Sequence, residues 1–321
     1  MLKALRRFAT TQSIQGGTDE QRSPLDRSSR SDPGATPMIF SDASTAASLV
    51  VDVHAHLGPA PRPGEAGTRL ERLISAMDAA GVDCACVFAS TGRGSDYPLE
   101  NNLIAELATE AGGRIVPFAR VDPAWRDEAA LSLRESAARG IRGLKLHPFM
   151  DGAFMANDRD LVHPLMSIAE DYGLIVLVHS GWGWNSSPGV VADLARAFPE
   201  VTVVMGHSGR YGYHREAAVV GSDFGNLQFD VAGLSIPGAI EELVRLVGPE
   251  RVLFGSDHPY SPMAFEIEKL ARWTTISWKD IEMIAGGNAA RLLGLKQPPG
   301  SPTVEVRRGV TVDEPRSEDG R

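Results

Sequence analysis

The sequence predicts an α/β protein folded as a single (β/α)8 barrel, and three observations support this fold class. Short apolar runs typical of strands recur eight times, the segments between them have helical periodicity, and the repeating region approaches the ~250 residues of such barrels. Successive runs start 24 to 33 residues apart, near Val51, Val82, Arg114, Ile141, Leu174, Val201, Leu227 and Arg251. Regular alternation of strand and helix predicts one domain with a parallel sheet.

The strands of this barrel are expected to be buried on both faces. The run from Leu174 to Val178 is continuously apolar, which is typical of a parallel strand between a helical layer and the barrel interior. A doubly wound open sheet is the alternative fold. It more naturally uses fewer strands, and no glycine-rich phosphate loop follows Val53.

The helices are predicted from one-sided apolar stripes, in which apolar residues recur at positions i, i+3, i+4 and i+7. Three stripes have this spacing: Leu70, Leu73, Ile74 and Met77; Val191, Leu194, Ala195 and Phe198; Ile240, Leu243, Val244 and Val247. Glycines follow several stripes, where a helix C-terminus favours a residue that tolerates positive φ. They are Gly81, Gly113, Gly140, Gly173 and Gly248.

Residues 1–47 and 296–321 differ in composition and are predicted to be disordered extensions of a barrel domain at 48–295. Both are rich in polar residues and proline and poor in large apolar residues. Basic residues precede the first acidic one, Asp19, as in an organellar transit peptide, whereas a functional product that begins near Met38 would give the same pattern.

Charge and cysteine content limit the partners and the compartment. A formal net charge of −9 and a pI of about 5.4 argue against nucleic acid and anionic membrane surfaces as partners. The apolar runs are much shorter than the ~20 residues that cross a bilayer. Cys84 and Cys86 lie one residue apart on a predicted strand, where a disulfide would be strained. We expect a cytoplasmic protein with two core thiols, with organellar targeting as the alternative.

Polar residues gather at the ends of the predicted strands, where a barrel opens into one shared mouth. Six of the eight histidines are in these strand-end segments: Asp52-Val53-His54-Ala55-His56, Lys145-Leu146-His147, His179-Ser180-Gly181, His207-Ser208-Gly209 and Ser256-Asp257-His258. Residues two apart on a strand face the same way, so His54 and His56 can share an ion. The last strand of a barrel closes against the first, which brings Asp257 beside them. Together these side chains supply enough nitrogen and oxygen donors for a divalent metal.

These motifs resemble the amidohydrolase superfamily. The resemblance covers Val51 to Leu295 and includes Gly143-Leu144-Lys145-Leu146-His147-Pro148, Gly206-His207-Ser208-Gly209, Phe254-Gly255-Ser256-Asp257-His258-Pro259 and Gly287-Asn288-Ala289-Ala290-Arg291-Leu292-Leu293. The most similar branch is the metal-dependent TIM-barrel group that contains aminocarboxymuconate-semialdehyde decarboxylase.

The resemblance implies a site for one divalent metal, most often zinc, with manganese or iron as alternatives. The implied ligands are His54, His56, His179 and Asp257, and His207 stands beside them as proton shuttle or electrophile. Asp257 would also accept a proton from water and pass it to the leaving group.

The two polar residues of the fourth strand end have open roles. In two-metal members of the superfamily a lysine at the place of Lys145 is carboxylated and bridges the ions; in the branch that this sequence resembles, one metal and an unmodified lysine are expected. His147 is either a substrate contact or a structural hydrogen-bond partner.

Several residues near the strand ends are candidate substrate contacts. Trp182 and Trp184 would form an aromatic wall or pack their loop shut. The candidates for binding a substrate carboxylate are Arg93, Arg120 and Arg210, which are otherwise solvated loop charges. Asp230, at the end of the seventh strand, is expected to orient other side chains rather than bind the metal.

Three functions follow from these residues. The first is a metal-dependent hydrolase of an amide, ester or lactone in a small substrate, for which a carboxylate-bearing or unsaturated molecule is the expectation. The alternative is a non-oxidative decarboxylase, a carbon–carbon lyase with the same ligands; the third is a catalytically inactive binding barrel. Barrels of this branch often dimerise, so a homodimer is a further expectation.

Overall fold

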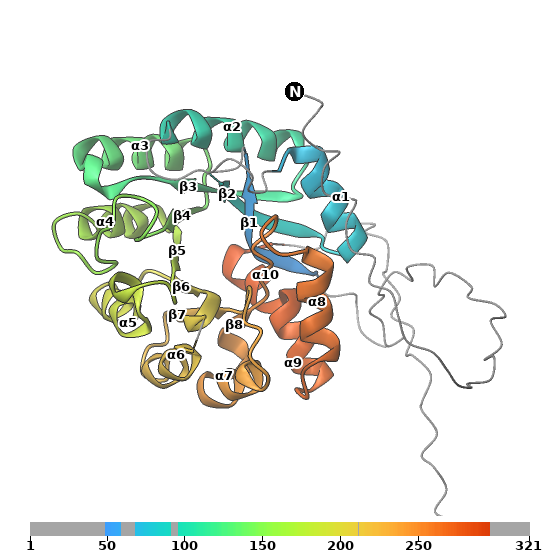
Figure 1. Ribbon diagram of the computed structural model, residues 1–321. Coiled ribbons are helices and arrows are strands. Elements are labelled where there is room, and N and C mark those ends of the chain that lie inside the picture. The colour runs from blue at the N-terminus through green and yellow to red at the C-terminus, as the bar shows by residue number, and fades with distance from the viewer. Residues whose placement is uncertain (1–48, 59–67, 91–95, 211, 296–321) are drawn as a thin grey trace, which may run out of the picture. The chain divides into compact units, whose positions relative to one another are not determined.

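The computed structural model describes residues 49–58, 68–90, 96–210 and 212–295. The predicted extensions, 1–47 and 296–321, lie outside these residues. Within the described chain, eight parallel strands form one sheet in sequence order, and Figure 1 shows them at the centre of a ring of helices. The strands are β1 (Val51–Leu57), β2 (Cys84–Ala89), β3 (Ile115–Arg120), β4 (Gly143–Leu146), β5 (Ile175–His179), β6 (Val203–Gly206), β7 (Leu227–Asp230) and β8 (Val252–Leu253). The predicted (β/α)8 barrel is confirmed, and each strand begins within two residues of its predicted start.

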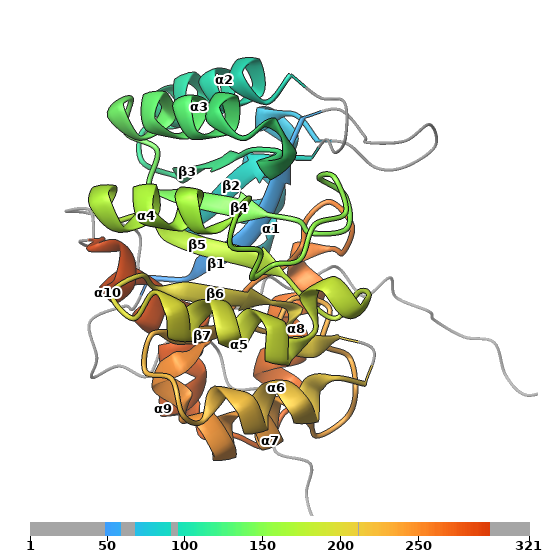
Figure 2. The same cartoon turned by 90° about the vertical axis from the view of Figure 1, so that its left-hand side faces the viewer.

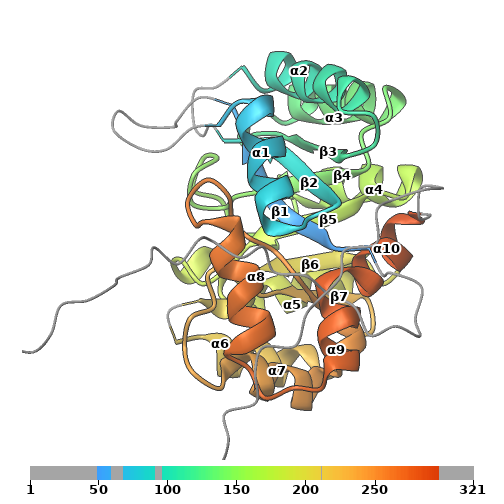
Figure 3. The same ribbon diagram turned by 90° about the vertical axis from the view of Figure 1, so that its right-hand side faces the viewer.

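Helices lie outside the strands on all sides, as Figures 2 and 3 show. They are α1 (Leu70–Ala80), α2 (Tyr97–Glu110), α3 (Asp127–Ala138), α4 (His163–Tyr172), α5 (Pro188–Ala197), α6 (His214–Gly221), α7 (Ala239–Val247), α8 (Met263–Arg272), α9 (Trp278–Glu282) and α10 (Asn288–Leu293). The predicted stripes face the core in α1, α5 and α7, except that Phe198 comes just after the end of α5. Gly81 and Gly173 end their helices in the left-handed conformation, at φ 70° and 63°, as the sequence predicts.

Hydrogen bonds between β8 and β1 close the barrel. Beyond Leu253 the chain continues alongside β1, where Val53 N donates to Phe254 O at 2.9 Å and His56 N donates to His258 O at 2.8 Å. Asp257 N donates to His54 O at 2.7 Å. Asp257 therefore lies beside the histidines of β1 although about two hundred residues separate them in the chain.

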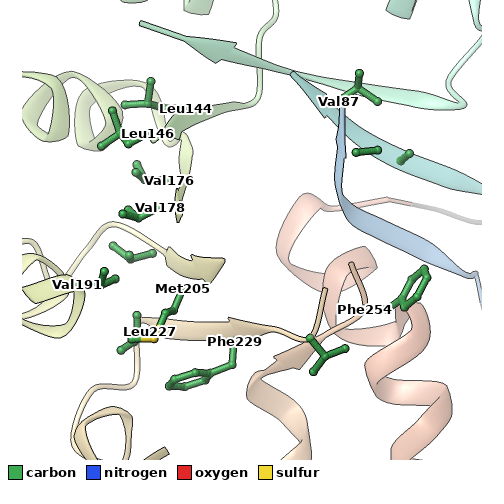
Figure 4. Close-up of a cluster of buried hydrophobic side chains, with 14 of the residues drawn as sticks. Val87, Leu144, Leu146, Val176, Val178, Val191, Met205, Leu227, Phe229 and Phe254 are labelled. Atoms are coloured by element: carbon green, nitrogen blue, oxygen red, sulfur yellow. The ribbon is translucent and has the colours of Figure 1, made fainter. Parts of the chain in front are cut away.

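The apolar core has two parts. One lies between the strands and the surrounding helices and includes Val87, Leu144, Val176 and Phe229, which Figure 4 labels. The other fills the barrel interior at the end away from the polar strand ends, where side chains from several strands contact Ala289 and Leu293 of α10. The barrel is thus a packed core with its polar groups at one end.

A bulge in β1 turns the two histidines inward. Val51 and Val53 belong to the barrel-interior cluster, whereas Ala55 and Leu57 belong to the cluster beneath the helices. Simple alternation would keep all four on one face. The register with β2 shifts between Asp52 and Ala55, and the extra residue exchanges the faces of the strand. His54 and His56 consequently point into the mouth of the barrel.

The two cysteines are unbonded and buried on β2, as the sequence predicts. Burial raises the pKa of the Cys84 thiol to about 11, so this thiol stays protonated near neutral pH. No helix within the described ranges is both long enough and apolar enough to cross a bilayer.

A substitution at Gly286 tests how closely the chain packs beneath the barrel. This glycine lies in the π-helical turn Met283–Gly287, and a Cβ added there would be 1.6 Å from the Leu49 carbonyl oxygen. We expect Gly286→Ala to lower the free energy of unfolding by about 1–3 kcal/mol, because backbone must move. Gly287→Ala is the matched control, since its nearest contact would be Glu282 O at an ordinary 3.5 Å. Equal unfolding midpoints of the two variants in urea would contradict this packing.

Candidate metal-binding active site

The strand ends bring most of the predicted site residues into one buried cluster at the mouth of the barrel. His54 and His56 come from β1, His179 ends β5, and His207 and Asp257 directly follow β6 and β8. None of these five side chains belongs to a residue more than 7% exposed. The cluster is therefore largely shielded from water.

His54 is held in one tautomer by its neighbours. Its Nδ1 is 2.5 Å from Asp230 Oδ2, and because a carboxylate only accepts, Nδ1 carries the hydrogen. Nε2 consequently presents its lone pair to the cluster, 3.4 Å from Asp257 Oδ1, and accepts a hydrogen bond from Lys145 Nζ at 2.9 Å. A carboxylate behind a ligating imidazole is the usual support of a metal site.

The remaining donor atoms lie close to His54 and to one another. His56 Nε2 is 3.1 Å from Asp257 Oδ1, and His207 Nε2 is 3.1 Å from His179 Nδ1. Donor atoms of His54, His207 and Asp257 all lie within 4.8 Å of one another. Ligands about 2.1 Å from a tetrahedral metal are separated by about 3.3 Å, so these spacings suit a shared ion.

The chemistry of the donor set also fits a divalent cation. Burial lowers the pKa of His54, His179 and His207, and it lowers the pKa of His56 to about 4, so the imidazoles are neutral with lone pairs near pH 7. His56 Nδ1 and His179 Nε2 are buried without a hydrogen-bond partner in the described chain. Burial opposes ionisation of Asp257, yet the nearby histidines outweigh it and lower its pKa. Three imidazoles and a carboxylate can thus hold one metal ion.

Lys145 of β4 lies at the base of the cluster. Its Nζ is 4.5 Å from the ring centroid of Phe88, and this ring also lies beside His54 and His56, with centroids 5.3 and 4.6 Å apart. Burial lowers the pKa of Lys145 to about 7. Phe88 was not predicted as part of the site, because in sequence it is one apolar residue among several on β2.

Two predicted catalytic residues have strained backbones. His207 and Asp257 adopt φ values of 64° and 61°, in the left-handed region that side chains other than glycine rarely occupy, and Ser208 follows at 44°. Such conformations persist where surrounding contacts over-determine them and concentrate at functional sites. Here the strain turns both side chains toward the cluster.

Serines at three strand ends connect their strand to the next one around the barrel. Ser180 Oγ donates to Gly206 O at 2.7 Å, and Ser208 Oγ donates to Asp230 O at 2.7 Å. Ser256 Oγ donates to the Asp52 carboxylate at 2.5 Å, across the closure between β8 and β1. Each serine is next to a histidine or aspartate of the cluster, so each bond fixes a functional side chain as well as a strand.

His147 and the two tryptophans line the mouth beyond the cluster. The His147 ring stacks on His179, with centroids 3.8 Å apart and planes inclined by 13°. Trp182 lies edge-on to His179 at 5.7 Å and is 40% exposed, whereas Trp184 is 76% exposed. Trp182 thus belongs to the wall of the site, and Trp184 lies farther out.

The Arg120 guanidinium already donates within the protein. Its Nε and Nη2 donate to Asp151, and its Nη1 donates to Ala89 O at 2.9 Å. Tyr97 donates to the same Asp151 carboxylate at 2.6 Å. Sequence reasoning missed Asp151 and Tyr97, which lie outside the strand-end motifs, and their contacts give Arg120 a structural environment rather than an open face.

Arg210 lies at the edge of the cluster. Its Nη1 is 3.5 Å from Asp257 Oδ2, and its side chain is 27% exposed. A Cβ at Gly233 would be 2.9 Å from Arg210 Cζ, so the guanidinium rests against that glycine. Arg93, the third predicted arginine, lies outside the described residues.

The chain matches a family model described as amidohydrolase over residues 51–295, the range that the sequence motifs predict. A search of curated proteins returned no match.

Solved structures share the fold. An uncharacterized TIM-barrel protein from Bordetella bronchiseptica is 24% identical, with a TM-score of 0.64, and the match covers 77% of this chain and 98% of that one. The 5-carboxyvanillate decarboxylase LigW from Sphingomonas paucimobilis is 18% identical, with a TM-score of 0.62 over 77% and 99% of the chains. A dihydroxybenzoic acid decarboxylase from Polaromonas sp. JS666, with bound manganese and the inhibitor 2-nitroresorcinol, is 14% identical, with a TM-score of 0.62 over 77% and 97%. At these identities the likeness establishes the fold.

A substitution at Asp230 tests whether its hydrogen bond to His54 supports metal binding at the cluster. Asp230→Asn keeps the volume but leaves one oxygen to accept from both His54 Nδ1 and Ala232 N, which now bind separate oxygens. We expect zinc affinity, measured by competition with a chromogenic chelator, to fall about 10- to 100-fold while the fold remains. Asp223→Asn, on an exposed carboxylate, should bind zinc like the wild type. Unchanged affinity in Asp230→Asn would refute its supporting role.

Proposed function

Since the chain belongs to the amidohydrolase family, we propose that it is a metal-dependent decarboxylase that removes carbon dioxide from a small aromatic or conjugated carboxylate. The sequence motifs favour hydrolysis, but decarboxylases among the solved structures with this fold support the alternative. The proposal rests chiefly on one observation: buried imidazole and carboxylate donors converge on one point with a guanidinium at their edge.

The proposed metal ligands are His54, His56, His179 and Asp257. Zinc is the first candidate because neutral imidazoles dominate the set, and manganese is the alternative, supported by its presence in the Polaromonas enzyme. A divalent ion here would act as a Lewis acid toward oxygen atoms of the substrate. Lys145 is proposed to remain unmodified, with its Nζ at the cluster as a donor to the substrate, since a metal bound to His54 Nε2 would take the lone pair that Lys145 now contacts.

The surroundings suit a planar anion. Arg210 places positive charge at the edge of the cluster, and charge-assisted hydrogen bonds to carboxylate are among the strongest available to a protein. Lys145, whose pKa is lowered to about 7, adds a further N–H donor. Phe88 and Trp182 add aromatic surface beside His54 and His179. An unsaturated ring that bears a carboxylate matches both features.

Decarboxylation requires one proton at the carbon that loses the carboxylate. The carbon–carbon bond breaks, carbon dioxide leaves, and the electron pair that remains on the carbon takes up the proton. His207 Nε2, which has a free lone pair because Nδ1 donates to Ala232 O at 2.9 Å, is placed to take a proton from water and pass it to this carbon, so that the reaction consumes one solvent proton.

Hydrolysis is the second candidate, favoured by the family match itself. The same residues would then serve a water molecule that attacks an amide, ester or lactone, with Asp257 accepting its proton and His207 stabilising developing charge. The two reactions differ in the atoms that enter the product.

Isotope incorporation distinguishes the reactions. The enzyme is incubated with a panel of hydroxybenzoic acids and unsaturated dicarboxylates, once in D2O and once in H2¹⁸O. We expect release of carbon dioxide and one deuterium at the vacated carbon, and Asp257→Asn should lower turnover at least about 10³-fold. Asp171→Asn, an exposed change on α4, is the control with normal turnover. A product that gains ¹⁸O without carbon dioxide would replace decarboxylation by hydrolysis.

Metal content tests the ligand assignment, because the donor atoms that lie within 4.8 Å of one another include His207, which is 3.1 Å from His179 Nδ1. We expect about one zinc per wild-type chain after zinc addition and desalting. His179→Ala should lose most of this zinc, since a ligand is removed, whereas His207→Ala should keep it. Elemental analysis that gives the reverse order would make His207 a ligand and His179 the proton carrier.

A further inference from the structure

A buried ion pair lies beneath the loops that follow β7 and β8. Glu266 and Lys269 are one turn apart on α8, and they are only 2% and 4% exposed. Lys269 Nζ donates to Glu266 Oε2. Burying such a pair is costly unless further hydrogen bonds satisfy both groups.

Those further hydrogen bonds go to the main chain of one short segment, Val231–Gly233. Lys269 Nζ donates to Val231 O at 3.0 Å, and Gly233 N donates to Glu266 Oε2 at 3.2 Å. The ion pair thus holds both ends of the segment by hydrogen bonds: Lys269 donates to Val231, and Glu266 accepts from Gly233. Ser261 Oγ donates to Glu266 Oε1 at 2.7 Å and ties in the loop after β8.

The middle residue of the segment contacts the site. Ala232 O is 2.9 Å from His207 Nδ1, and because a carbonyl only accepts, this contact keeps the hydrogen on Nδ1 and leaves Nε2 toward His179. Among the described residues, this is the hydrogen bond that fixes the outer nitrogen of the His207 ring.

We infer that Glu266 and Lys269 are positioning residues, which hold the Ala232 carbonyl so that His207 keeps its Nδ1–H tautomer and its orientation. Their effect passes through the backbone, since neither side chain is bonded to His207. The catalytic consequence rests on the proposed role of His207, whereas the tautomer itself does not.

The same segment supports a second side chain of the site. Arg210 rests on Gly233, where a Cβ would come within 3.2 Å of its Nε and Nη2. Displacing Val231–Gly233 would therefore move the guanidinium beside Asp257 together with the His207 ring. One buried pair on a peripheral helix thus controls two groups at the mouth.

If the ion pair only stabilises the fold, a different experimental result is expected. Apolar residues of similar volume often replace a buried ion pair with no loss of stability. Glu266→Leu/Lys269→Met should therefore fold, yet it removes both side-chain hydrogen bonds to Val231–Gly233. A structural role predicts an unchanged His207 ring in this variant, and a positioning role predicts a changed one.

The experiment uses the full chain labelled with ¹⁵N-histidine and loaded with diamagnetic Zn²⁺, and it records long-range ¹H–¹⁵N correlations of the rings, with His207→Gln assigning the His207 signals. We expect a protonated Nδ1 and an unprotonated Nε2 in the wild type. In Glu266→Leu/Lys269→Met the His207 Nδ1–H signal should be lost or shifted toward the average of two tautomers. Turnover of the substrate identified above should fall about 10- to 100-fold. KM should rise as well, because Arg210, which is proposed to bind the substrate carboxylate, moves with the same segment.

Two controls separate positioning from stability. Glu268→Gln/Arg272→Gln removes an exposed ion pair from the same helix and should leave the His207 signals unchanged. Ser261→Ala removes a contact of Glu266 that does not reach Val231–Gly233, and it should also leave them unchanged. If the Leu/Met variant does not fold, Glu266→Gln/Lys269→Met, which still lacks the donor to Val231 O, is judged by the same signal.

An unaltered His207 ring in a folded double variant would overturn the inference, whatever reaction the protein catalyses. A changed ring with no detectable decarboxylation in any variant would support the inference and count against the proposed function. The two can therefore fail separately.

Discussion

The pairing of the chain after β8 with β1 is the constraint on which the site depends. The bond from Asp257 N to His54 O joins the two backbones at 2.7 Å, next to the place where a bulge in β1 has turned His54 and His56 inward. Without closure the carboxylate would have no reason to lie near the histidines; without the bulge the imidazoles would face the helices. Convergence of the donor atoms follows from these two backbone features together.

Much of the fold could be predicted because its signals are local. An apolar run such as that of β5 and a stripe such as that of α7 depend on neighbouring residues, and glycines such as Gly81 mark helix ends through their own φ. The strand-end location of the histidines could also be predicted, because in a parallel barrel chain direction alone decides which ends meet.

The pairwise contacts within the site could not be predicted in this way. Arg120 was a candidate for binding substrate, but Asp151 occupies its guanidinium from a loop 31 residues away. Lys145 was an open case, and its contact with His54 Nε2 depends on both side chains filling the same interior. Neither partner has a spacing or motif that marks it, because these contacts arise from packing across the barrel rather than along the chain.

The strand-end serines have an evolutionary consequence. Each ties its own strand to the next one around the ring before the chain departs into its loop, so the reactive constellation is anchored beneath the segments that meet the substrate. Loops that start beyond these anchors can lengthen, shorten or change composition while the histidines and the aspartate of the cluster keep their places. A barrel arranged like this can acquire new substrates through changes in the loops at its mouth while it keeps the same reactive groups.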